Sequence, residues 1–255
     1  MPEPTSPRSR PAPDRRVQTL APEPPLPTSH SVRLGVLLAL VGGALDAFTF
    51  VAHGGVFANA QTGNIVLLGI AAARGQWAQA LNQLPAIIAF VMGVVVAESL
   101  KRPRVAAAVR WPARAALVLE IVVLAGVGLA PADTPDMLVT VVIAFTASVQ
   151  VSTFRKLVDT AYNTTMTTGN LRTATQSAYK AVVDRDREAA RRARQFAAVI
   201  AAFLAGASGG GLLTATAGAR TLWALVGLLT LGLALFVYDE GVAARSSAPA
   251  HAGGK

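Results

Sequence analysis

Two carboxylates lie inside long apolar stretches of this 255-residue chain, where an ionised side chain is costly. They are Asp46 and Glu120. A carboxylate in such a place is typical of a proton or cation site, or of a structural group bonded to nearby backbone. Both readings stay open for Asp46, with Asn64 as a further structural partner. Glu120 follows Arg114 by six residues and is expected to pair with a loop arginine, with a coupling proton as the alternative.

The triplet Thr-Gly-Asn occurs twice, at Thr62-Gly63-Asn64 and at Thr168-Gly169-Asn170. Glycine permits a sharp turn, and Thr and Asn side chains can cap a helix that restarts after it. A helix start carries partial positive charge, so it suits an anion or a solute that accepts hydrogen bonds. The alternative is a helix cap in an ordinary loop.

Amide and hydroxyl groups before both copies extend the candidate site, unless they only satisfy unwound backbone. The predicted coupling residues are the two carboxylates, and the predicted solute-binding residues are Asp46, Gln61, Thr62, Gly63, Asn64, Asn163, Thr168, Gly169 and Asn170.

Other chemistry finds little support in the residues. The chain has no cysteine, which excludes thiol catalysis and cysteine-ligated zinc, and one histidine within the apolar stretches makes no metal site. Hydrolase and phosphate-loop motifs are absent. The net charge of +9 comes from tails and loops between apolar runs, which favours membrane orientation over nucleic-acid binding. We therefore expect no enzyme activity, cofactor, metal or nucleic-acid partner.

Six apolar runs are long enough, or nearly so, to cross the ~30 Å of a bilayer core. They are 34–53, 80–100, 115–130, 137–154, 196–213 and 221–238. Only 15% of the residues are charged, against about a quarter in soluble domains. The segments 56–73 and 160–180 hold the Thr-Gly-Asn copies, and counting both as spans would give eight.

Loop charges favour six spans. Residues 101–114 contain five basic residues and no acid, whereas 131–136 contain two acids and no base. Six spans with both termini in the cytoplasm keep the basic loop inside, and eight spans would place it outside. We predict an all-α integral protein of the bacterial inner membrane, with the lipid bilayer as its main partner.

The two triplets reveal a repeat. Thr168 follows Thr62 by 106 residues, and the same offset relates Phe48 to Phe154 and three apolar runs of one half to three of the other. Three spans per half is an odd number, so the second half must enter from the opposite side, as in many transporters. We predict two inverted three-helix repeats, about 31–131 and 137–240, each with a broken or re-entrant Thr-Gly-Asn segment.

The ends of the chain are expected to be disordered tails. Residues 1–30 contain nine prolines and few apolar residues, and 241–255 are similarly poor in apolar pattern. The predicted membrane domain is therefore 31–240.

A family resemblance rests on two signatures. The first is Gly-Gly-Ala-Leu-Asp-Ala-Phe at 42–48, Phe57, and Ala-Gln-Thr-Gly-Asn-Ile-Val-Leu-Leu-Gly at 60–69. The second is Asn163-Thr164-Thr165 with Met-Thr-Thr-Gly-Asn-Leu at 166–171. Together they resemble the bacterial YoaK-like membrane proteins (domain of unknown function 1275) over about 31–240. The resemblance implies a multi-span inner-membrane protein and supplies no substrate or reaction.

The function expected from these features is a small-solute transporter or channel-like permease with a site between the two Thr-Gly-Asn segments. Its solute would be small and polar or anionic. The alternative is a membrane scaffold or sensor that transports nothing, suggested by the N-terminal tail and by the basic cluster 184–194. That cluster is expected to be a solvated, cytoplasmic extension of the helix that begins the fifth span.

The six-span topology makes a direct prediction. A reporter fused within residues 101–114 should be active only on the cytoplasmic side of the inner membrane, because five basic residues hold that loop inside. The measurement compares a periplasm-dependent with a cytoplasm-dependent reporter at the same site. Activity of the periplasmic reporter there would rule out six spans and the inversion.

Overall fold

The computed structural model describes residues 32–102, 111–154, 156–157, 160–161 and 167–246. The predicted tail 1–30, most of 241–255, and Asn163 lie outside the described residues. The last helix continues to Ser246, six residues beyond the predicted end of the membrane domain.

Each predicted apolar run corresponds to one helix. These helices are α1 (Val32–Ala52), α3 (Trp77–Leu100), α5 (Pro112–Gly128), α6 (Asp136–Thr153), α8 (Arg187–Ala217) and α9 (Thr221–Ser246). By length and hydropathy α1, α3, α6 and the continuous α8–α9 stretch can each cross a membrane. With 17 residues, α5 is at the lower limit for a span. The chain is therefore a helical membrane protein.

Two more helices begin at the Thr-Gly-Asn copies. Helix α2 (Gln61–Ala73) forms a hairpin with α3, and α7 (Thr167–Val183) forms one with α8. A short 3-10 turn, η2 (Gly218–Arg220), joins α8 to α9. Within the described residues the structure departs from the predicted all-α chain at one place, where β1 (Lys156–Leu157) pairs antiparallel with β2 (Thr160–Ala161).

Local sequence explains several helix ends. Asp186 caps α8, since its Oδ1 accepts hydrogen bonds from the backbone N–H groups of Glu188 at 2.8 Å and Ala189 at 3.1 Å. The charged cluster predicted to extend the fifth span is thus the first turns of α8. Pro112 begins α5, where a missing N–H costs nothing. Gly75, with φ of 70°, allows the tight turn between α2 and α3.

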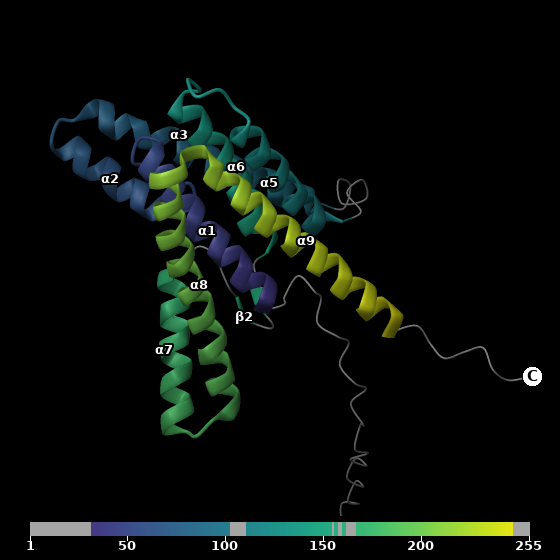
Figure 1. Ribbon diagram of the computed structural model, residues 1–255. Coiled ribbons are helices and arrows are strands. Elements are labelled where there is room, and N and C mark those ends of the chain that lie inside the picture. Colours follow the sequence, from purple (N-terminus) through teal and green to yellow (C-terminus); the bar gives the residue numbers. More distant parts are fainter. Residues whose placement is uncertain (1–31, 103–110, 155, 158–159, 162–166, 247–255) are drawn as a thin grey trace, which may run out of the picture.

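Helix α1 lies at the centre of the molecule. It packs along α8 and also contacts α9, while α3 packs against α6, and α5 lies between α6 and α9 (Figure 1). The main core is built from aliphatic and aromatic side chains of α1, α5, α6 and α9, including Leu38, Val41, Leu45, Phe48, Leu117, Leu124, Ile143, Leu222 and Leu229.

The α1–α8 contact depends on small residues. A Cβ on Gly206 would overlap the Leu40 backbone, with its carbonyl carbon at 2.7 Å, and a Cβ on Gly210 would lie 2.6 Å from Ala44 Cα. Leu40 therefore faces Gly206 and Ala44 faces Gly210, so the two helices run parallel. Small residues four apart let helix backbones approach closely, which compensates for the weak hydrophobic drive between helices in lipid.

Polar contacts join helix ends at two opposite levels. At one level His53, after α1, contacts Asp136 at the start of α6, with Nδ1 2.8 Å from Oδ1. At the other, Arg114 of α5 binds Glu240 of α9 (Nε to Oε2 2.9 Å). Lys101, after α3, binds Glu98 at 2.6 Å and the Ser152 carbonyl at 3.1 Å.

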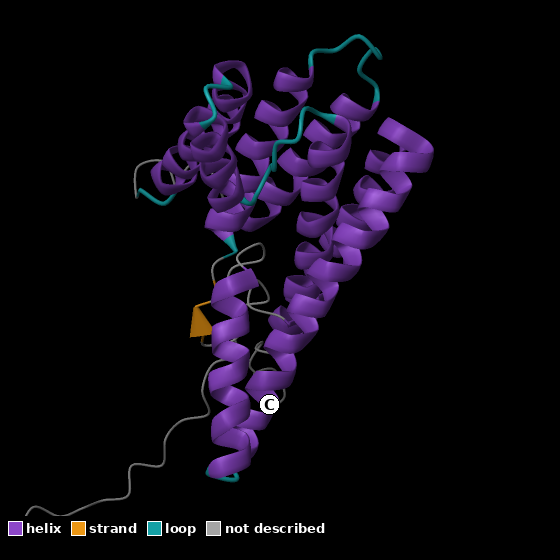
Figure 2. Ribbon diagram, turned by 90° about the vertical axis from the view of Figure 1, so that its left-hand side faces the viewer, coloured by secondary structure: helices purple, strands orange, loops and turns teal. Residues whose placement is uncertain are grey.

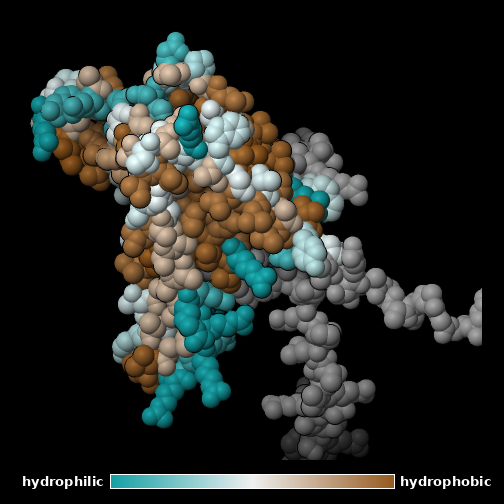
Figure 3. Space-filling view, viewed as in Figure 1, coloured by the Kyte–Doolittle hydropathy of each residue, from teal (hydrophilic) through white to brown (hydrophobic). Residues whose placement is uncertain are grey.

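The hairpin of α7 and the first half of α8 extends away from the apolar body. Figure 2 shows it below the rest of the molecule, and Figure 3 shows hydrophilic residues there against a largely hydrophobic bundle. The charged start of α8 explains this, because Arg187, Arg191, Arg192 and Arg194 cannot face lipid cheaply.

The close α1–α8 contact can be tested by glycine substitution. Gly206→Leu should lower the thermal unfolding midpoint in detergent, because forced overpacking typically costs about 1–3 kcal/mol. Gly209→Ala is the matched control, since a Cβ there meets no atom within 4 Å. Equal midpoints for both variants would contradict the proposed contact.

Candidate functional site at the break before α2

The chain reverses direction after α1. Gly54 and Gly55 have φ of 73° and 68°, a conformation that favours glycine, and they turn the chain back along α1. The Asn59 side chain then donates to the Gly42 carbonyl at 3.2 Å. Gly42 lies ten residues before the end of the 21-residue α1, so Asn59 sits beside the middle of that helix. This places the start of α2 about 15 Å along α1 from its end.

Asp46 supports this reversed segment. Its Oδ1 accepts the backbone N–H groups of Asn59 at 2.6 Å and of Ala60 at 3.4 Å. One turn further along α1, Thr49 Oγ1 accepts the N–H of Ala58 at 3.1 Å. Three consecutive backbone donors outside any helix or sheet thus find side-chain acceptors on α1. Of the two structural partners weighed for Asp46, the observed one is backbone, and Asn64 bonds elsewhere.

The second carboxylate oxygen of Asp46 has no such role. Oδ2 is buried and has no hydrogen-bond partner within the described part of the chain. Buried polar atoms without partners are few in folded proteins and call for an explanation such as a functional role. Asp46 therefore combines a structural oxygen with an oxygen that is open to a proton or a ligand.

Asn64 closes the loop before α2. Its Oδ1 accepts the Phe57 N–H at 2.8 Å, and its Nδ2 donates to the Phe57 carbonyl at 2.7 Å and to Gln61 Oε1 at 2.9 Å. Gln61 donates in turn to the Ala58 carbonyl at 2.8 Å. The fully buried Asn64 amide is therefore occupied by its own loop.

The predicted helix cap is wrong for this first copy. Ala60 occupies the N-cap position without a side-chain bond, and Thr62 is exposed. The Asn64 side chain instead bonds Phe57 in the preceding loop. The Gly63 N–H bonds the Ala60 carbonyl at 2.8 Å, so it needs no side-chain cap. Gly63 provides room rather than a turn, since a Cβ there would lie 2.9 Å from the Phe57 ring.

The second copy repeats part of this pattern. Thr168 and Gly169 are exposed and Asn170 is buried, as Thr62 is exposed and Asn64 buried in the first copy. Further along α7, Ala174 packs against a cluster that includes Ala39 of α1 and Phe196 of α8. The first turns of α2 and of α7 thus both lie near α1, and each helix runs outward to its hairpin tip (Figure 1).

Glu120 has a different partner from the one expected. Its Oε2 accepts from Gln150 Nε2 of α6 at 2.7 Å, and both side chains are buried. Arg114 lies on another face of α5 and pairs with Glu240 of α9, so Arg114 is not the arginine partner of Glu120, and Arg104 and Arg110 lie outside the described residues. Gln150 thus links α6 to α5 through a buried hydrogen bond.

Two residues of the observed site, Thr49 and Asn59, are not among the predicted solute-binding residues. Thr49 lies three residues after Asp46 and so shares its helix face, a spacing that could have indicated a joint role. Within the described residues no three His, Cys, Asp or Glu side chains gather as metal ligands would.

Comparison with known proteins gives two matches. A family model described as "Protein of unknown function (DUF1275)" matches residues 34–235. The UPF0700 transmembrane protein YoaK of Bacillus subtilis (strain 168) is 31% identical over 140 residues, which are 53% of this chain and 61% of that protein. The match thus spans less than two thirds of that relative. No solved structure matches the chain.

The triplet offers a matched pair of variants. Asn64→Ala should lower the free energy of unfolding by about 2–4 kcal/mol, because it removes several buried hydrogen bonds worth roughly 1 kcal/mol each and leaves backbone groups unpaired. Thr62→Ala should change it by less than about 0.5 kcal/mol, as expected for an exposed side chain. Thermal unfolding in detergent reports both, and equal effects would contradict the loop-closing role of Asn64.

Proposed function

Since this chain belongs to the DUF1275 family of membrane proteins, whose function is unknown, we propose a function from its own geometry: transport of a small polar or anionic solute across the bacterial inner membrane. The protein acts as a transporter or channel-like permease. The proposal involves no catalytic step and no cofactor.

One observation carries the proposal, namely the break between α1 and α2. Backbone without helical hydrogen bonds lies beside the middle of α1, held by Asp46 and Thr49. At membrane depth such backbone is tolerated only when it is buried in protein or lines a water-filled cavity, and transporters use it to bind solutes. The first Thr-Gly-Asn copy is then a re-entrant segment that enters from outside, with α2 returning to the same face.

Helix packing supports an inverted repeat. The offset of 106 residues between the triplets relates α1 to α6, α2 to α7, α3 to α8 and α5 to α9. The pairs of helices that pack together follow the same correspondence. The α1–α8 pair corresponds to the α6–α3 pair, and the α2–α3 hairpin corresponds to the α7–α8 hairpin. The first helix of each half therefore packs against a helix of the other half, so the two repeats are interlocked.

The polar contacts at the helix ends fit six spans that cross the membrane in alternating directions along the chain. The pair His53–Asp136 joins the end of one span to the start of another, as expected at the outer face. Arg114–Glu240 and Lys101–Glu98 lie at the opposite level, where basic residues concentrate. With the positive-inside rule, this level and both termini face the cytoplasm.

Coupling to protons is assigned to the two buried carboxylates. Asp46 has an unpartnered oxygen beside the break, and Glu120 bonds only a neutral amide among the described residues. Intramembrane carboxylates of this kind mark proton relays and ion pathways. The solute site itself comprises Asp46 and the two Thr-Gly-Asn segments, with Asn64 and Asn170 positioning the helix starts.

A scaffold or sensor role is the second candidate, and the tip of the α7–α8 hairpin favours it. Tyr179, Val182 and Val183 are 67%, 79% and 57% exposed there. Apolar side chains on a polar protrusion can dock a protein partner.

Flux through purified protein tests the transporter. Liposomes are mixed with an external excess of glycerol, sodium formate, sodium acetate or inorganic phosphate, and their volume is followed by stopped-flow light scattering. They shrink first and recover as the solute enters. With at least one of these solutes, liposomes containing the protein should recover faster than protein-free liposomes. Asp46→Asn should reduce that rate at least tenfold, because it keeps an oxygen for Asn59 and Ala60 but cannot carry the carboxylate's proton or charge. Asn170→Ala should also reduce it.

Thr230→Ala is the control and should leave the rate unchanged, since Thr230 is exposed on α9 and lies outside the assigned site. Thermal unfolding verifies that each variant is folded. Equal rates for wild type and a folded Asp46→Asn would overturn the assigned site. Absence of flux for all four solutes would favour the scaffold or sensor.

A further inference from the structure

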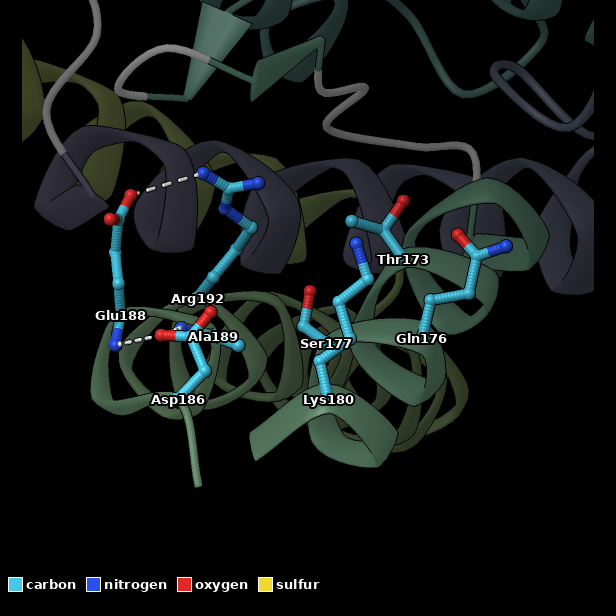
Figure 4. A pocket seen from close by; sticks show the side chains of 8 residues that line it. All are labelled: Thr173, Gln176, Ser177, Lys180, Asp186, Glu188, Ala189 and Arg192. Carbon is cyan, nitrogen blue, oxygen red and sulfur yellow. Dashed lines mark hydrogen bonds and ion pairs between the residues drawn. The ribbon is translucent and has the colours of Figure 1, made fainter. Parts of the chain in front are cut away.

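Two cavities occupy equivalent places in the two halves. One, of about 290 Å³, lies along the α2–α3 hairpin, and the other, of about 460 Å³, lies along the α7–α8 hairpin (Figure 4). Six lining positions of the first are Leu67, Ile70, Ala71, Arg74, Asn82 and Gln83. Adding the triplet offset gives Thr173, Gln176, Ser177, Lys180, Glu188 and Ala189, all of which line the second.

The offset between the triplets and the lining of the cavities are two independent observations, and they agree. The offset comes from the sequence, whereas the cavities come from the shape of the folded chain. The side chains at most of the paired positions differ in size and polarity, so similar residues do not create the match. It follows from a shared backbone arrangement, in which each hairpin leaves the same hollow beside its turn.

Basic character is retained at one pair of positions. Arg74 in the first cavity corresponds to Lys180 in the second, and in the described part of the chain neither has an acidic partner within ion-pair distance. Of the described residues that line the first cavity, Arg74 is the one that carries a charge.

The acids of the second cavity have other partners. Asp186 accepts the first N–H groups of α8, at 2.8 Å from Glu188 and 3.1 Å from Ala189. Glu188 bonds Arg192 at 3.4 Å. Figure 4 shows these contacts on one side of the cavity, with Lys180 extending toward Thr173 on the other. Lys180 is therefore the basic group available to a ligand.

We propose that the two cavities bind the same class of ligand, a small anion with hydrogen-bond acceptors such as a carboxylate or phosphate, one at each face of the membrane. The inference rests on the proposed transport function and names its substrate class. Arg74 with the Asn82 N–H that does not bond the Gly54 carbonyl forms the outer site, and Lys180 with the Ser177 hydroxyl forms the inner site. Charge-assisted bonds from guanidinium or ammonium groups suit such anions.

The absence of cysteine makes the test direct. Single cysteines are placed at the equivalent positions Ile70→Cys and Gln176→Cys, and their rates of reaction with a negatively and a positively charged methanethiosulfonate are compared at low salt. The negative reagent should be favoured at both. Adding Arg74→Gln to the first, or Lys180→Gln to the second, should slow the negative reagent and speed the positive reagent by about fivefold each, the effect of one unit charge at roughly 4 Å in water, so the preference should fall roughly 25-fold.

Lys180→Gln in the first background and Arg74→Gln in the second are matched controls, since each removes a basic residue that lines only the other cavity. They should leave the preference unchanged. Inorganic phosphate and sodium acetate, added at equal ionic strength to sodium perchlorate, should slow both reactions if they occupy the sites.

The outcomes separate the two levels of the proposal. An unchanged reagent preference when Arg74→Gln is added to Ile70→Cys, or when Lys180→Gln is added to Gln176→Cys, would overturn the anion sites, whatever the flux assay shows. Labelling from outside intact cells should reach Ile70→Cys alone, and Gln176→Cys should react only in inverted vesicles. Reaction of both from one side would overturn placement at opposite faces, and charge preference without flux would overturn transport while retaining the anion sites.

Discussion

The fold depends on a requirement that lipid imposes: every backbone N–H at membrane depth must find an acceptor within the protein. Helices meet it internally, and the segment between α1 and α2 does not. Asp46 and Thr49 meet it instead, by accepting the N–H groups of residues 58–60. Asn64 then fixes the other end of the segment through Phe57. A carboxylate within an apolar helix is costly, and this use explains why α1 retains one.

The second organising feature is the exchange of helices between halves. Because α1 packs on α8 and α6 packs on α3, neither half has an interior of its own. Glycines and alanines at the α1–α8 crossing allow this contact. Gly93 of α3 serves the corresponding one, since a Cβ on Gly93 would lie only 3.2 Å from Ser148 Cβ of α6. Each hairpin therefore packs against the first helix of the other half.

Much of the helical framework could be predicted from the sequence, because apolar runs must become helices in lipid. The six runs correspond to six helices, and the charge pattern also indicated the solvated start of α8. The roles of individual polar residues were harder to predict. Asn64 and Thr62 looked equivalent as caps, yet only the three-dimensional path of residues 56–60 shows that one is buried and the other exposed. The Glu120 partner also depended on helix rotation, which spacing along the chain does not define. The cavities beside the hairpins have no sequence signal until the fold makes the repeat positions comparable.

The contact between α1 and α8 also bears on how the protein is made. Helix α1 ends at Ala52 and α8 begins at Arg187. At a synthesis rate of about 5–20 residues per second, α1 waits on the order of ten seconds before its main partner emerges. During that time its glycine-lined face has no helix against it, while the chain that follows can already supply the donors for Asp46. The early loop can thus shield the carboxylate in the nascent chain before α8 is made.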